Sequence, residues 1–185
     1  MQAPAAQLLE HWKEFYLLIG TAAAALVALL FVAASIGVGI LTRHPGGPTR
    51  TYMSPVAFHF TSALFVSAIA LVPTHTRMTL GALVGLNALA GTVYAAFVLR
   101  RLFTDNIADL ADRICYGVIP LFAYAAGLAA AGLILRGSEL APEFLAGTVL
   151  LLLIVNIRNA WDLMLSLARR RAEIEAREPG VNSTS

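Results

Sequence analysis

Long stretches without a charged residue alternate with short polar segments along this chain. Four of them cover residues 15–42, 51–76, 78–99 and 114–135, and a fifth, residues 144–168, is interrupted only by Arg158 and Asp162. About 20 helical residues cross a bilayer, so each stretch is long enough. Backbone groups in hydrocarbon must be paired within the segment, which favours helices, and the strand-like alternation of a membrane barrel is absent. The pattern predicts an all-α integral membrane protein with five transmembrane helices.

The composition supports this class. Hydrophobic residues make up 58% of the 185 residues and charged residues 13%, whereas a soluble domain carries about 25% charged residues. The net charge of +2 and the single cysteine argue against disordered chains, nucleic-acid-binding proteins and disulfide-rich secreted scaffolds. The expected surroundings are a lipid bilayer, with no nucleic-acid partner.

Basic residues predict the orientation of the five spans. With five spans, one side of the membrane holds three basic residues, Lys13, Arg77 and Arg136, and the other holds nine arginines: Arg43, Arg50, Arg100, Arg101, Arg113, Arg169, Arg170, Arg171 and Arg177. Basic residues favour the cytoplasmic side, so the N-terminus is expected outside and the C-terminus inside. We expect an extracytoplasmic segment over residues 1–14, a transmembrane domain over 15–168 and a cytoplasmic tail over 169–185. The first span is too long for a secretory signal and is expected to be retained.

The segment between the third and fourth spans has an amphipathic pattern. Residues 102–113 place Leu102, Phe103, Ile107 and Leu110 on one side of a helix and Asp105, Asp109 and Asp112 on another. This pattern predicts a short helix in the cytoplasmic interface. The three aspartates are either a cation-attracting rim or, as charge runs usually are, a solvated face.

The last span carries the residues that most need an explanation. Counted inward from Arg169, Arg158 lies about 16 Å deep, near the bilayer midplane, and Asp162 follows one turn later on the same face. Asn159 and Asn156 extend this polar arc. Each charge at such a depth costs roughly 2.5–3.5 kcal/mol, so the arc should face other helices or a water-filled cavity. The Arg158–Asp162 pair is either functional or a device that fixes helix register.

Further polar side chains are expected to join this arc. His59 is predicted near the level of Asp162, Asn87 near the level of Arg158, and Tyr116 in the cytoplasmic half of the fourth span. Each has a structural interpretation too: Asn87 as a hydrogen bond between helices, His59 as a satisfied interior histidine, and Tyr116 as an interfacial belt residue.

Missing motifs restrict the chemistry. GxxxxGK[ST], HExxH, CxxC and GxSxG do not occur, so an enzyme, a metal site and a cofactor are not expected. Two hypotheses remain: a homo-oligomeric ion channel or small-solute transport protein, and a non-transporting scaffold or accessory subunit that docks partner helices. The abundance of alanine and arginine is typical of GC-rich bacterial genomes and suggests a bacterial inner (cytoplasmic) membrane.

Overall fold

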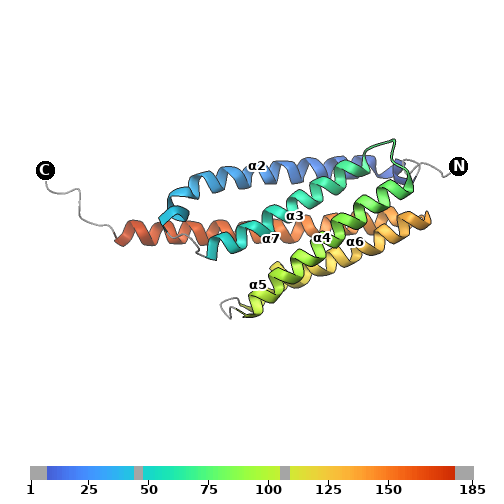
Figure 1. The fold of residues 1–185 in the computed structure, drawn as a ribbon. Helices are drawn as coiled ribbons and strands as arrows, with labels where there is room; N and C mark the ends of the chain where they lie inside the picture. The colour runs from blue at the N-terminus through green and yellow to red at the C-terminus, as the bar shows by residue number, and fades with distance from the viewer. Residues whose placement is uncertain (1–7, 44–47, 105–108, 178–185) are drawn as a thin grey trace.

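The computed structural model describes residues 8–43, 48–104 and 109–177, and within them the chain is all-α (Figure 1). Five long helices form it: α2 (Lys13–Arg43), α3 (Pro48–Ala70), α4 (Arg77–Thr104), α6 (Ile119–Arg136) and α7 (Ala141–Arg177). A 3-10 turn, η1 (Glu10–Trp12), precedes α2. The short α5 (Leu110–Arg113) and a π-helical turn, η2 (Ile114–Val118), lead into α6.

Four of the helical segments in the described part of the chain are long and apolar enough to cross a membrane: Glu10–Ser35, Arg77–Thr104, Leu110–Arg136 and Ala141–Ser166. Helix α3 contributes a shorter apolar segment, Ser54–Ala70. The chain is therefore a multi-pass membrane protein.

The helices pack as antiparallel neighbours, α2 on α3, α3 and α6 on α7, and α4 on α6 (Figure 1). At one end, which we call the N-terminal end of the bundle, the Tyr16 hydroxyl donates to the Pro142 carbonyl at 3.0 Å. The Arg77 guanidinium packs there on Gly137, whose φ of 68° suits glycine and ends α6. The start of α2, the α3–α4 turn and the α6–α7 turn thus share one end. The start of α6 and the C-terminal part of α7 lie toward the other, the C-terminal end.

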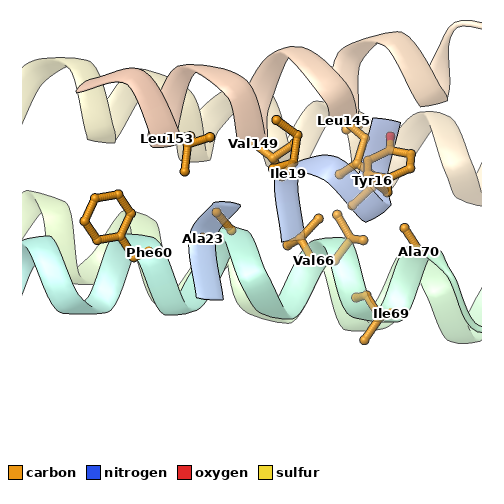
Figure 2. Packing of buried hydrophobic residues seen from close by; sticks show 14 of the residues in the cluster. Tyr16, Ile19, Ala23, Phe60, Val66, Ile69, Ala70, Leu145, Val149 and Leu153 are labelled. Carbon is orange, nitrogen blue, oxygen red and sulfur yellow. The ribbon is translucent and has the colours of Figure 1, made fainter. Parts of the chain in front are cut away.

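Apolar side chains of α2, α3 and α7 meet in a common core (Figure 2). Tyr16 and Ala23 of α2 and Val149 of α7 are fully buried, and Phe60 of α3 is almost so. Lipid is as apolar as this core, so close side-chain packing rather than escape from water holds such helices together.

The described residues cover only the two ends of the predicted interfacial helix, residues 102–113. Leu102 and Phe103 belong to the end of α4, which runs to Thr104, and Leu102 is buried against the bundle. Helix α5 has only four residues and continues through η2 into α6. Asp105 and Ile107 lie outside the described residues.

Candidate functional site

The Arg158–Asp162 pair expected from the sequence forms on α7. Arg158 Nη2 lies 3.1 Å from Asp162 Oδ2, one helical turn away. The two side chains are 42% and 39% exposed, so neighbouring helices of a single chain do not enclose the pair. Positions 158 and 162 lie toward the outside of the bundle, whereas Asn156 and Asn159 are completely buried. Only the asparagine part of the polar arc faces neighbouring helices.

Asn159 connects α7 to the start of the α6 segment. Its Nδ2 donates to the Cys115 carbonyl at 3.0 Å, and its own backbone carbonyl accepts from the Tyr116 hydroxyl at 2.7 Å. Its Oδ1 lies 3.5 Å from Arg158 Nη1. Tyr116 is therefore buried rather than part of an interfacial belt. One asparagine joins a backbone carbonyl of η2 to the exposed ion pair.

The π-helical turn explains why the Cys115 carbonyl needs this donor. In η2 the Ile119 N–H donates to Ile114, five residues back, whereas in an α-helix it would donate to Cys115. The residue after Ile119 is Pro120, which has no N–H to offer. The Cys115 carbonyl therefore lacks two successive helical donors, and the Asn159 side chain donates in their place.

These contacts also locate Arg158 along the bundle. Asn159 is level with Cys115 and Tyr116, which lie at the start of the fourth apolar segment, Leu110–Arg136. Arg158 therefore lies in the C-terminal half of the bundle, eight residues before the end of the apolar segment Ala141–Ser166. Its depth near the bilayer midplane stays a prediction.

The acidic residues at the start of α5, Asp109 before the helix and Asp112 within it, lie close to the pair. Asp112 is near enough to interact electrostatically with Arg158, Asp162 and Asp109, so Asp109 and Asp112 belong to the same charged surface. Asp105, the third residue of the predicted rim, lies outside the described residues. We call Asp109, Asp112, Arg158 and Asp162 the charged face.

A second polar group lies deeper in the bundle. His59 Nδ1 of α3 and the Tyr124 hydroxyl of α6 are 2.8 Å apart, and both residues are buried. Ser62 exchanges hydrogen bonds with Asn87 of α4, at 3.1 and 2.8 Å, which fits the interpretation of Asn87 as a link between helices. The Ser62 side chain also contacts Tyr124. We call these four residues the buried polar group.

The two groups are separated, so the predicted single network does not form. Tyr124 lies nine residues, about 13 Å, along the helical segment from Cys115. Tyr124, the partner of His59, packs with Leu152. Leu152 lies ten residues before Asp162 on α7, so His59 is about 15 Å from the level of Asp162 that was predicted for it. Asn87 adjoins Ala88, and Ala88 and Thr148 both lie beside Gly127. Thr148 is ten residues from Arg158 along α7, so Asn87 is also far from the predicted level. How far α3 and α4 are shifted along α7 depends on the packing between the helices, which the sequences of α3 and α4 alone do not specify.

Several buried side-chain polar atoms of the described residues have no hydrogen-bond partner, and Ser67 Oγ of α3 is among them. His59 Nε2 and Asn156 Oδ1 are two others, although Asn156 Nδ2 donates to the Leu152 carbonyl at 2.7 Å. The position of the Tyr124 ring beside His59 depends on Gly91 of α4. A Cβ at Gly91 would strike the Tyr124 ring, so this glycine makes room for the ring that meets His59.

An apolar groove runs beside the ion pair. Its volume is about 520 Å³, and it lies between Leu26 and Leu29 of α2 and Ile154, Ile157, Arg158 and Trp161 of α7. The Trp161 side chain is 66% exposed. Arg158 is the one charged residue of this lining, so the groove is not a water-lined passage.

Among the described residues, no three His, Cys, Asp or Glu side chains are grouped in a way that could hold a metal ion. No protein-family model, curated protein or solved structure matches the chain. The charged face, the buried polar group and the groove remain as the features from which a function is inferred.

Proposed function

We propose that this chain is a small membrane protein that acts as a homo-oligomer and carries an ion or small solute along a polar pathway between subunits. The proposal includes five spans, with α3 as the fifth, an outside N-terminus and a bacterial inner membrane. Helix α3 has 23 residues, about 35 Å in length, and it packs against both α2 and α7. A helix of this length inside the bundle is long enough for the hydrocarbon layer.

The position of the charged face carries the proposal. Arg158 and Asp162 are partly exposed on the outside of the bundle, whereas Tyr124, His59 and Leu152 fill the interior. Ionisable groups within membrane spans are expensive to bury and commonly mark ion or solute pathways. A pathway that uses these charges therefore has to form where chains meet, since one chain holds them on its outer surface.

A scaffold that docks partner helices is the second candidate. It is favoured by the apolar residues on α7 beside the ion pair, because Ile154, Ile157 and Trp161 are all well exposed. In that case the charges select a partner and no solute crosses. The two candidates share the contact surface and differ in whether anything moves.

Flux through proteoliposomes tests the proposal. Vesicles with the wild-type chain should release monovalent cations, anions or a small neutral solute faster than empty vesicles, and Arg158→Ala should reduce the rate about ten-fold or more. Lys13→Ala is the matched control, because Lys13 also forms an ion pair on an exposed helix surface, with Glu10 at 2.8 Å. Wild-type vesicles as tight as empty vesicles toward all three probes would refute transport and favour the scaffold.

A further inference from the structure

We infer that a second copy of this chain docks on the α7 surface, with Arg158 of each copy facing Asp162 of the other across a two-fold axis. This inference rests on the homo-oligomer of the proposed function and identifies the face through which it forms. The contact surface consists of the ion pair, the groove between α2 and α7, and the exposed apolar side chains described next.

Exposed apolar residues on α7 form a ridge of the kind that packs helices together. Leu150, Ile154, Ile157 and Trp161 are exposed and follow one another at spacings of four, three and four residues. This alternation keeps a seam on one side of a helix that faces another helix. We call these four residues the α7 ridge.

Such a ridge does not identify a docking site by itself, because exposed apolar residues also suit lipid. Helix α4 has a comparable series, Leu86, Leu89, Val93 and Phe97, all more than half exposed. The α7 ridge differs in having Arg158 and Asp162 beside it. Hydrocarbon offers these charges no hydrogen-bond partner, so α7 is the face that another polar surface has to cover.

A second copy of the chain can place its Asp162 against Arg158 and its Arg158 against Asp162. A two-fold contact uses the same patch on both chains, so the patch must complement itself, and a patch with one cation and one anion does. In a parallel pair, Arg158 and Asp162 of opposite copies differ in height by one turn, about 6 Å. The same difference in height is already bridged within one chain, at 3.1 Å.

Hydrogen-bonding capacity remains on both residues. A guanidinium has five N–H donors, of which Nη2 faces Asp162 and Nη1 lies 3.5 Å from Asn159 Oδ1. The Asp162 carboxylate has a second oxygen that can accept. Two copies can therefore share four charges without breaking either internal pair, and Trp161 can fill the groove beside Leu26 and Leu29 of the partner.

Charge reversal in trans tests the inference. Arg158→Asp gives a copy with two acidic residues at these positions, and Asp162→Arg gives a copy with two basic residues. Each variant alone should associate at least ten-fold more weakly than wild type by light scattering in mild detergent. An equimolar mixture should regain wild-type affinity as a heterodimer, since every cross-chain contact is then between opposite charges. Mixing without recovery would overturn the inference.

Cross-linking gives an independent test that leaves the charges intact. In a Cys115→Ala background, Ile157→Cys should form disulfide-linked pairs in liposomes. Leu86→Cys, on the matching α4 ridge, should not. Cross-linking through Leu86 alone would place the contact on α4 and overturn the inference, as would a monomeric wild-type protein that retains an anionic phospholipid against Arg158.

The outcomes separate this inference from the proposed function. Flux by an oligomer that assembles through α4 would leave transport standing and remove the α7 contact. A dimer that obeys charge reversal but carries no solute would keep the α7 contact and remove transport.

Discussion

Asn159 of α7 donates its side-chain amide to the carbonyl of Cys115 at 3.0 Å, a bond that runs between helical segments 44 residues apart in sequence. The π-helical turn and Pro120 deprive that carbonyl of its helical donors, so the asparagine completes the hydrogen bonding of another helix. A π-helical turn frequently marks a functional position. Here it lies next to the only charges that α7 carries between Glu143 and Arg169.

Replacing Asn159 tests this arrangement. Asn159→Leu removes the donor and leaves the Cys115 carbonyl buried without a partner, which should lower the free energy of unfolding by about 1–3 kcal/mol. Pro120→Ala restores an N–H within the helix. It should therefore recover part of the loss in an Asn159→Leu background, and a double-mutant cycle measured by denaturation in detergent should show coupling between the two positions. Additive effects would mean that Pro120 is not the reason for the bond.

Gly91 is expected to be intolerant of any side chain. A Cβ at this position would collide with the Tyr124 ring, so Gly91→Ala should displace the ring from His59 and destabilise the fold by roughly 1–3 kcal/mol. Gly132→Ala is the matched control, because a Cβ at Gly132 meets nothing within 4 Å. Thermal unfolding in detergent measures both, and equal effects would contradict the steric explanation.

Much of the helical layout could be predicted from the sequence, because a span needs only a long apolar run. The Arg158–Asp162 pair followed from a spacing of four residues on one helix. The heights of His59 and Asn87 could not be predicted, since they depend on how far α3 and α4 slide along α7. The Asn159–Cys115 hydrogen bond could not be predicted either. It depends on a backbone carbonyl that lacks its helical donors because of Pro120 and η2, and only the folded structure shows which side chain donates to that carbonyl.

The hydroxyl of Tyr124 should stabilise the bundle through His59. Tyr124→Phe removes one partner of the 2.8 Å bond and leaves His59 Nδ1 buried without it, at a cost of about 1–3 kcal/mol. Tyr94→Phe is a suitable control, because the Tyr94 ring also packs near His59, with ring centroids 6.2 Å apart. Nitrogen chemical shifts of the His59 ring should change in Tyr124→Phe and remain unchanged in the control; unchanged shifts in both would contradict the bond.

Cysteine labelling checks the orientation of the bundle in the membrane. In a Cys115→Ala background, Thr74→Cys and Ser138→Cys lie at the N-terminal end of the bundle and should react with an impermeant reagent added outside intact cells. Gly46→Cys should react only after the cells are opened, since arginines favour the cytoplasmic side. Labelling of Gly46→Cys and Ser138→Cys from the same side would mean that α3 does not cross the membrane.

The stability of the ion pair should depend on whether the chains are associated. In a single chain both side chains keep substantial exposure, and an exposed pair contributes about 0–1 kcal/mol. Arg158→Ala and Asp162→Ala should therefore change the free energy of unfolding by less than about 1 kcal/mol in dilute detergent, where the chains are separate. Association covers the pair, and removal of one partner then leaves a buried charge alone, at a cost of roughly 3–5 kcal/mol.

Denaturation at two ratios of protein to detergent separates these states. At the higher protein concentration the double variant should lose less than the sum of the two single losses, because neither charge is left alone. The Glu10–Lys13 pair, exposed at the other end of the bundle, should show no dependence on concentration when either residue is changed to alanine. If the cost of Arg158→Ala is equally small at both concentrations, no second chain covers this face. If it is large in the separated chains, the pair is already shielded within one bundle, and it serves to fix α7 rather than to join two copies.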